Sequence, residues 1–230
     1  MLRLERCEIT NGGFTLQADL QITAGMKLAI IGPSGAGKST LTEAITGFLP
    51  LQRGRILWRD QDLAGLAPGK RPMAMLFQDG NLFPHLTVAQ NAGLGLRPNL
   101  RLSETERAKV QRALTRVGLG DLADRKPAAL SGGQQSRVAL ARVLLQRRDI
   151  LLLDEPFAAL GPALKDEMLD LVAQIATETG ATVLMVSHDP KDARRIADQV
   201  ILVAEGKAHP PKETADLLDN PPPALKAYLG

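Results

Sequence analysis

Residues 32–39 limit the possible folds of this chain more than any other segment. Their sequence is Gly-Pro-Ser-Gly-Ala-Gly-Lys-Ser, they follow the apolar run Leu28 to Ile31, and they precede an apolar-periodic stretch, 39–48. A glycine-rich loop between a buried strand and a helix allows backbone N–H groups to surround phosphate oxygens. The pattern therefore predicts an α/β core that contains a phosphate-binding P-loop.

The residues of this loop have separate expected roles. The Lys38 ammonium should face the β- and γ-phosphates of a nucleotide, and the Ser39 hydroxyl should ligate Mg²⁺. The alternative is a glycine-rich turn that only caps a helix. The predicted nucleotide-binding residues of the loop and the helix start are Gly32, Pro33, Ser34, Gly35, Ala36, Gly37, Lys38, Ser39 and Thr40.

A second glycine pair lies in the stretch Leu130, Ser131, Gly132, Gly133 and Gln134. The spacing of Ser131 and Gln134 is that of a helix capping box, in which each side chain satisfies a backbone N–H group. The glycines are unexplained by capping, since each costs roughly 1 kcal/mol relative to alanine in a helix. Bare backbone at a helix N-terminus can approach an anion closely, so we predict a second phosphate-binding element here.

Three ionisable side chains are expected at the carboxyl ends of buried strands. Asp154 and Glu155 follow the apolar run 150–153, and His188 follows the run 183–186. Ligands of open α/β sheets bind beyond these strand ends. We expect Asp154 to hold Mg²⁺ through water, Glu155 to act as general base, and His188 to contact the γ-phosphate or orient the attacking water. The alternatives are a polar loop and a structural histidine.

Gln78 ends the strand predicted at 73–77, where it could sense Mg²⁺ and the attacking water. Beyond it the pattern changes from strands to helices, and later the α/β alternation returns. The last apolar run, 200–203, is expected to close the sheet. The other strands are predicted at 2–10, 14–22 and 55–59, and the helices at 87–91, 103–117, 134–146, 163–179 and 191–197.

Composition excludes several classes of function. Basic and acidic residues number 28 and 25 and are interspersed, and aromatic residues make up only 3%, too few for a base-stacking surface. We therefore expect no nucleic-acid partner. No apolar run reaches 18 residues, which argues against a bilayer span. The single cysteine, Cys7, permits no internal disulfide and is expected to be a small apolar residue of the first strand.

The chain resembles the ABC ATPase family over essentially its whole length. The resemblance rests on an ordered set of motifs: the P-loop, Gln78, the stretch 130–134, the pair Asp154 and Glu155, and His188. Within that family, the chain is most similar to the ATP-binding subunits of bacterial thiamine importers. That similarity rests on residues 75–91, 93–96, 150–160, 162–164 and 184–188.

The resemblance implies one ABC ATPase domain over 1–230. Its P-loop NTPase (RecA-like) core, with an N-terminal antiparallel β subdomain, would comprise 1–78 and 149–230, and its α-helical subdomain would comprise 79–148. The stretch 130–134 would be the signature loop, which closes on ATP and Mg²⁺ held by the other subunit of a homodimer. The segment after Gln78 would dock onto integral-membrane permease subunits at the cytoplasmic face of the bacterial inner membrane, and a periplasmic solute-binding protein would be an indirect partner.

Two positions depart from the family pattern. Asn11 stands where an aromatic residue usually stacks on adenine, and Phe14 is the nearby ring. Gly161 replaces an aspartate that normally links the two ATP sites. We expect slower or less coordinated hydrolysis rather than none. The remaining alternatives are the same motor serving iron, sulfate, polyamine or another solute, and a weakly hydrolysing or non-hydrolysing nucleotide-binding regulatory module.

Overall fold

The computed structural model describes residues 1–77, 81–158 and 160–229. The strands are β1 (Leu2–Asn11), β2 (Phe14–Ile22), β3 (Lys27–Ile31), β4 (Arg53–Trp58), β5 (Gln61–Asp62), β6 (Met73–Leu76), β7 (Ile150–Asp154), β8 (Thr182–Val186), β9 (Gln199–Ala204), β10 (Lys207–Ala208) and β11 (Lys212–Glu213). The α-helices are α1 (Lys38–Thr46), α2 (Val88–Gly93), α3 (Glu104–Arg116), α4 (Gly132–Leu145), α5 (Pro162–Thr179), α6 (Pro190–Ile196), α7 (Thr214–Asp219) and α8 (Pro223–Leu229). Short 3₁₀ turns occur at Pro68–Lys70, Gly120–Leu122 and Pro127–Ala129.

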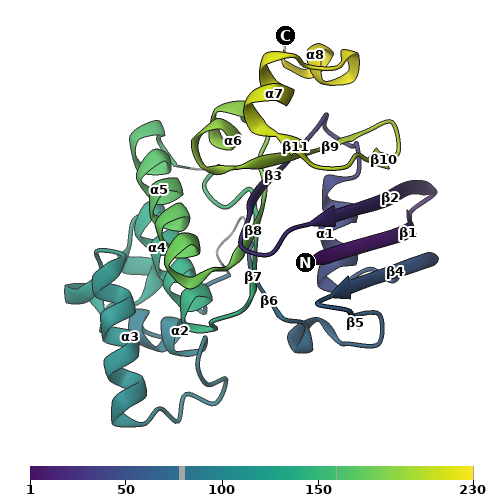
Figure 1. The fold of residues 1–230 in the computed structure, drawn as a ribbon. Coiled ribbons are helices and arrows are strands. Elements are labelled where there is room, and N and C mark those ends of the chain that lie inside the picture. Colours follow the sequence, from purple (N-terminus) through teal and green to yellow (C-terminus); the bar gives the residue numbers. More distant parts are fainter. Residues whose placement is uncertain (78–80, 159, 230) are drawn as a thin grey trace.

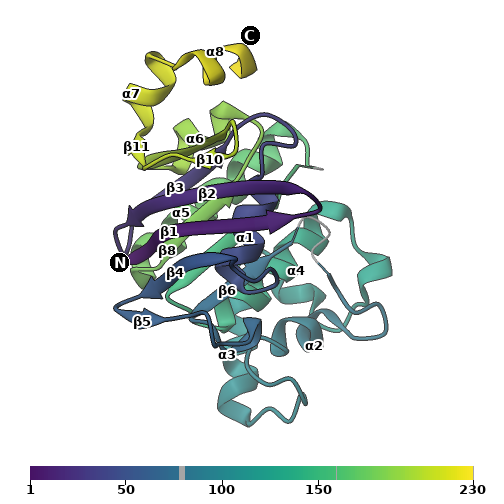
Figure 2. The same cartoon turned by 90° about the vertical axis from the view of Figure 1, so that its right-hand side faces the viewer.

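One mixed sheet runs through the molecule in the order β5-β4-β1-β2-β10-β9-β3-β8-β7-β6, and β11 pairs with β9. The strands β9, β3, β8, β7 and β6 are parallel, and β1 pairs antiparallel with β2 and β4. Helix α1 lies between the antiparallel and parallel strands, and α4 and α5 cover the opposite face of the parallel strands (Figures 1 and 2).

The parallel strands are apolar at successive positions because both of their faces are covered. On β3, Leu28 and Ile30 pack in a cluster with α1 and the N-terminal strands. The alternate residues, Ala29 and Ile31, pack in a cluster that contains residues of α6, α7 and β9. The continuous apolar runs that predicted buried strands therefore follow from this layering.

Helix α1 is held firmly at the end remote from the P-loop. The buried Arg71 guanidinium donates hydrogen bonds to the carbonyl oxygens of Ala44 (2.9 Å) and Ile45 (2.6 Å). A cation beside the last carbonyls of a helix satisfies orphan acceptors and the negative end of its dipole. This contact fixes the direction of α1, and hence the position of its first turn.

The predicted helices and strands all appear, with ends within two residues of those observed. The predicted place of one strand is wrong. Residues 200–203 do not close the sheet, because β9 lies inside it, between β3 and β10. This pairing joins the parallel strands to the antiparallel ones. The short elements β5, β10, β11, α7 and α8 were not predicted.

The helical arm is built around a cluster shared by α2, α3 and α4. Helix α4 uses two faces: Val138 and Ala141 pack within the arm, whereas Leu140 and Val143 pack against α5 and the parallel strands. Helix α4 therefore packs against both the helical arm and the α/β core. None of the helices in the described part of the chain is long and apolar enough to cross a bilayer.

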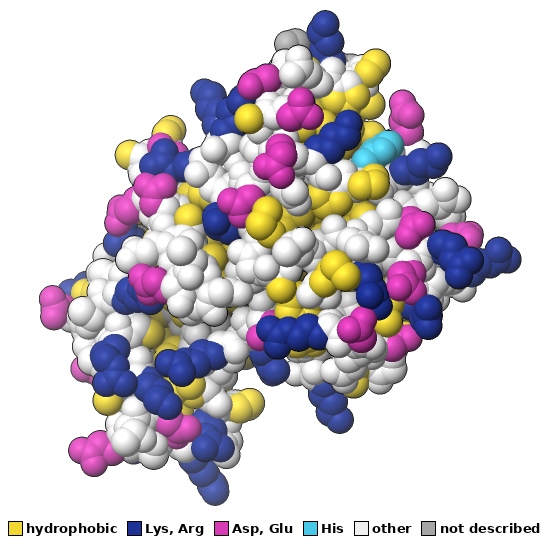
Figure 3. Space-filling model, viewed as in Figure 1, with side chains coloured by type: hydrophobic (Ala, Val, Ile, Leu, Met, Phe, Trp, Pro, Cys, Tyr) yellow, Lys and Arg dark blue, Asp and Glu magenta, His cyan; other side chains and the backbone are white. Residues whose placement is uncertain are grey.

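Acidic and basic side chains alternate over the face of the molecule seen in Figure 3. This mixture agrees with the interspersed charges of the sequence and with its small net charge of +3.

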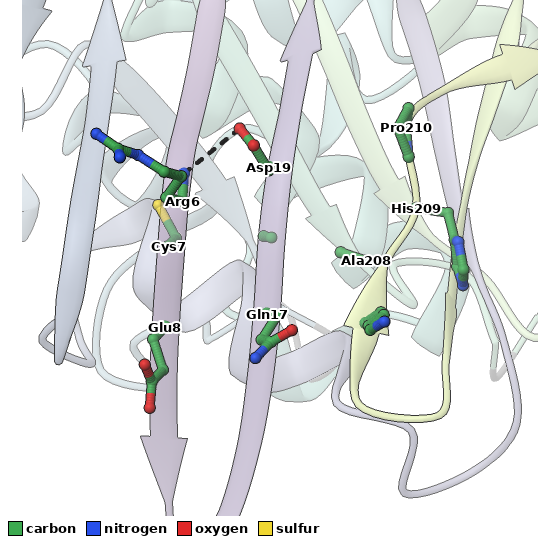
Figure 4. A pocket seen from close by; sticks show the side chains of 10 residues that line it. Arg6, Cys7, Glu8, Gln17, Asp19, Ala208, His209 and Pro210 are labelled. Carbon is green, nitrogen blue, oxygen red and sulfur yellow. Dashed lines mark hydrogen bonds between the residues drawn. The ribbon is translucent and has the colours of Figure 1, made fainter.

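Cys7 is an apolar residue of the core, as predicted from the sequence. Its side chain is 2% exposed although a hollow of about 430 Å³ opens beside it between β1, β2 and β10 (Figure 4). The Sγ atom donates to the carbonyl oxygen of Arg55 at 3.2 Å. Burial raises the pKa of the Cys7 thiol to about 11.

We predict that Cys7 in the folded protein reacts slowly with a disulfide reagent at pH 8, because only about a thousandth of the thiol is ionised there. Unfolded protein should react fast under the same conditions. Since the folded pKa is raised above its ordinary value of 9.0, the free energy of unfolding should fall as the pH rises from 9 towards 11. A Cys7→Ala variant should not show this fall in the free energy of unfolding between pH 9 and 11. Rapid labelling of the folded wild-type protein at pH 8 would contradict the prediction.

Candidate active site

Strand register brings the sequence-predicted groups to one edge of the sheet. Ile30 and Asp154 are both paired with Val186, so β3, β8 and β7 end side by side. The backbone N–H of Glu155 donates to the carbonyl oxygen of Val186 (3.1 Å), and that of Ser187 donates to Ile30 (3.3 Å). The P-loop, the two acids and the His188 loop therefore leave the sheet at the same level.

Within the P-loop, Lys38 binds its own loop. Its Nζ donates to the carbonyl oxygens of Gly32 (2.7 Å) and Pro33 (2.9 Å). Burial lowers the pKa of Lys38, and the nearby charges of Glu155 and Asp154 oppose this shift. The ammonium is thus held over the loop, facing a site that also contains two carboxylates.

The start of α1 is suited to an anion. Gly37, its N-cap, has a φ of +103° and no side chain to cap the helix, whereas α2, α3 and α4 each begin with a capping box. The first N–H groups of α1 are left to another acceptor. Ser34, Gly35 and Ser39 are exposed, so this end of the helix is open to a ligand.

Phe14 lies directly against the P-loop. A Cβ atom added at Gly37 would come within 2.7 Å of its Cε1, so the ring occupies the space above the bare backbone. Phe14 is at the first position of β2, paired with Asn11. The structure thus places the predicted ring beside the predicted phosphate loop.

The acidic end of β7 concentrates negative charge. Burial raises the pKa of Asp154, and the carboxylates of Glu155 and Glu43 add to this shift, while Lys38 lowers it. Glu43 was missed by the sequence reasoning, although it lies one turn after Ser39 on α1. The Asp154 carboxylate and the exposed Ser39 hydroxyl offer hard oxygen atoms, the ligand type that Mg²⁺ prefers, so the chemistry of these residues fits that ion.

Glu155 and His188 lie close together. The Nδ1 atom of His188 is 3.4 Å from Oε2 of Glu155. Glu155 has a φ of +44°, a left-handed conformation that non-glycine residues adopt at a cost and that is concentrated at functional sites. Gln78, the third residue predicted to be catalytic, lies outside the described residues.

The stretch 130–134, the predicted signature loop, lies at the start of α4. The predicted capping box is present: the Ser131 hydroxyl accepts from the Gln134 N–H, and the Gln134 side chain accepts from the Ser131 N–H. Gly132 is exposed, and a Cβ there would meet no atom within 4 Å. A Cβ at Gly133, in contrast, would lie 2.3 Å from Cδ2 of Leu164 on α5.

The absence of a side chain therefore has a different structural explanation at each of the two glycines. Gly133 is buried and its missing side chain makes room for Leu164 within the same chain. Gly132 has no such reason among the described residues, so its bare backbone is the one available to an external anion.

The sequence profile described as ABC transporter matches residues 16–158, more than half of the chain. The chain belongs to the ABC transporter family. Other members are similar to it from end to end. The thiamine import ATP-binding protein ThiQ of Ruegeria sp. is 69% identical over 230 residues, and that of Cereibacter sphaeroides is 62% identical over 230 residues; each comparison covers 100% of both chains.

Solved structures of ABC proteins have the same fold. An ATP-binding cassette in a dimeric post-hydrolysis state, bound to ADP and Pi, has a TM-score of 0.80 and 29% identity, covering 93% of this chain and 99% of the other. The protein cbiO1 from Clostridium perfringens, part of the ABC transporter complex cbiONQ, has a TM-score of 0.85 and 30% identity, covering 95% of this chain and 90% of the other. The predicted fold class, an α/β P-loop NTPase core of the ABC ATPase type with added β and helical parts, is confirmed.

The contrast between the two signature glycines gives a paired prediction. Gly133→Ala should lower the free energy of unfolding by about 1–3 kcal/mol, because the methyl group would overlap Leu164 in a packed contact. Gly132→Ala should leave stability unchanged or raise it by up to about 1 kcal/mol, since alanine favours the helix. Urea unfolding of both variants beside the wild type measures this difference. Equal losses in the two variants would contradict the packing argument.

Proposed function

We propose that this chain is the ATP-hydrolysing subunit of a binding-protein-dependent ABC importer for thiamine or its phosphates. The convergence of the P-loop, Glu155 and His188 at one sheet edge supports ATP hydrolysis. The full-length similarity to thiamine import ATP-binding proteins supports the cargo. The same motor for iron, sulfate or polyamine is the second candidate, because this subunit would not touch the solute.

The P-loop backbone and the first turn of α1 would hold the phosphates, with Lys38 moving from its loop carbonyls to the β- and γ-phosphates. Phe14 would contact the adenine, since the ring already lies over Gly37. Ser39 and Asp154, together with Gln78, would hold Mg²⁺. The bound ion would neutralise charge that develops on the phosphate oxygens.

Hydrolysis would depend on the pair at the ends of β7 and β8. Glu155 would accept a proton from the attacking water as general base. His188, 3.4 Å from that carboxylate, would orient the water or donate to the γ-phosphate. Both side chains are partly or well exposed, so a water and a phosphate can reach them.

The exposed backbone of Gly132 supports a second half-site that works in trans. In a head-to-tail homodimer, the signature loop, residues 130–134, would close on ATP held by the P-loop of the other subunit. The N-terminal N–H groups of α4 would then face the γ-phosphate. Two ATP molecules would be enclosed per dimer, and closure would push a permease towards its outward-facing state.

A permease contact is supported by exposed aromatic residues around the segment that follows β6. Phe48 is 59% exposed and Phe83 is 47% exposed. Their rings lie beside Phe77 and His85, respectively, at centroid distances of 6.4 and 6.0 Å. Exposed aromatic groups are typical anchors at protein interfaces. We place this surface at the boundary between a core of 1–78 and 149–230 and a helical subdomain of 79–148, against permease subunits at the cytoplasmic face of the bacterial inner membrane.

Glu155→Gln should abolish steady-state ATP hydrolysis by the subunit assembled with its permease, with kcat falling by at least about 10²-fold, because the general base is lost. ATP affinity should stay within a few-fold of the wild-type value, since glutamine keeps the shape of the side chain. Phosphate release and nucleotide binding measure the two quantities. Unchanged transport by this variant would favour the non-hydrolysing regulatory module, and no ATPase activity of the wild-type assembly under saturating Mg-ATP would refute the proposal.

The cargo is tested separately by uptake of labelled solutes in cells that carry the permease and its binding protein. Thiamine uptake should require this subunit and should stop in the Glu155→Gln variant. Uptake of iron, sulfate or polyamine should be independent of it. If uptake of iron, sulfate or polyamine required this subunit and uptake of thiamine did not, the second candidate would be established.

Gly161→Asp should raise the ATPase rate or the cooperativity of hydrolysis, because it restores the carboxylate that links the two sites in relatives. The substitution fits the fold: Gly161 is the N-cap of α5, has an extended φ of −64°, and a Cβ there would meet no atom within 4 Å. Aspartate is also a favoured N-cap, so stability should not fall. Hill coefficients of ATP hydrolysis for the two proteins measure the effect, with Gly161→Ala as the control without a carboxylate.

A further inference from the structure

One lysine binds two carboxylates that follow His188 in the sequence. Nζ of Lys165, on the first turns of α5, lies 2.6 Å from Oδ1 of Asp192 and 3.0 Å from Oδ2 of Asp189. Asp192 also accepts a hydrogen bond from the Ser187 hydroxyl. The residues that precede and follow His188 are thus joined through a single network.

This network is sheltered from solvent. The Asp192 side chain is 9% exposed and that of Lys165 is 16% exposed. Burial alone would lower the pKa of Lys165, but its hydrogen bonds and charge interactions with Asp192 and Asp189 outweigh burial and raise it. Removing one partner of such a sheltered pair leaves an uncompensated charge, which costs much more than the loss of a surface ion pair. The contacts of Lys165 should therefore fix the position of the loop.

The same turns of α5 also contact helix α4, which begins in the signature loop. Leu164 fills the space left by Gly133. Three residues after Leu164, both carboxylate oxygens of Glu167 accept from Nη2 of Arg137 on α4, each at 2.9 Å. Lys165 lies between these two contacts in the sequence and reaches in the other direction, to the His188 loop. One short segment, 164–167, therefore contacts both functional loops of the subunit.

We propose that Lys165 is a positioning residue for His188, which it ties to the turn of α5 on which the signature glycine Gly133 packs. The proposal rests on the proposed function, in which both loops act on ATP. A shift of the signature loop on closing over the partner subunit's nucleotide would move α5 and, through Lys165, the His188 loop of its own site. The two ATP sites would communicate through each subunit.

The first test is spectroscopic and independent of catalysis. The chain has three histidines, so each ring can be assigned in a carbon-labelled NMR spectrum of the full chain. Lys165→Met should shift the His188 ring signals and leave those of His85 and His209 in place. Lys165→Arg should largely restore the wild-type position. Lys191→Met is the matched control, because it removes an equal charge from an exposed lysine beside the same loop.

Because Lys165→Met leaves two carboxylates unpaired, its fold is checked by thermal unfolding. A second variant, Lys165→Met with Asp192→Asn, removes the charge imbalance but still lacks the tether. Both should shift the His188 signals. An unmoved His188 signal in either folded variant would overturn the proposal.

The second test is kinetic and uses the subunit assembled with its permease. Lys165→Met should lower kcat on the order of tenfold with ATP affinity little changed, because a misplaced catalytic group affects the transition state more than binding. In a His188→Ala background, the same substitution should change the residual single-turnover rate less than about twofold. An equal loss in both backgrounds would show that Lys165 acts elsewhere. If His188→Ala retained full activity, the role of His188 in the proposed function would fail, whereas the NMR result would still decide whether Lys165 positions the loop.

Discussion

The parallel pairing of β8 with both β3 and β7 is the constraint on which the rest of the site depends. Val186 is in register with Ile30 on one side and with Asp154 on the other. A shift of one residue in either pairing would move each loop by about 3.3 Å along the strand and reverse the faces of its side chains. The position of Glu155 relative to the P-loop and His188 is therefore set by the hydrophobic packing that fixes the sheet.

Hydrophobic packing also fixes the position of the signature loop relative to the parallel strands. Helix α4 packs one face on the parallel strands through Leu140 and Val143, and its N-terminus is fixed against α5 by the contact between Gly133 and Leu164. The glycine that permits this contact is adjacent to the one that remains open, Gly132. Close packing within the chain explains Gly133, and in the proposed function close approach of the partner subunit's nucleotide would explain Gly132.

Local patterns were sufficient for much of this description. The P-loop follows from a glycine-rich sequence between an apolar strand and a helix, and the capping box follows from the three-residue separation of Ser131 and Gln134. The interior place of β9 could not be predicted, because strand order depends on pairing between distant segments. For the same reason, the sequence did not predict the role of Glu43 or the partners of Lys165. Each of these contacts joins residues from different elements, and a charged residue type alone does not identify its partner. Helices α7 and α8 were missed because prolines and short length obscure their periodicity.

The absence of a carboxylate at Gly161 gives these long-range contacts their importance. With glycine as the N-cap of α5, the start of the helix has no side chain that could reach another subunit in the proposed homodimer. Its position must then come from contacts within the chain: Leu164 with the signature loop, Lys165 with the His188 loop, and Glu167 with α4. Packed contacts and sheltered ion pairs have few alternative arrangements, so a displacement at one is transmitted rather than absorbed. In the proposed homodimer, the first turns of α5 would therefore relate the signature loop and the His188 loop of one subunit without a carboxylate at Gly161.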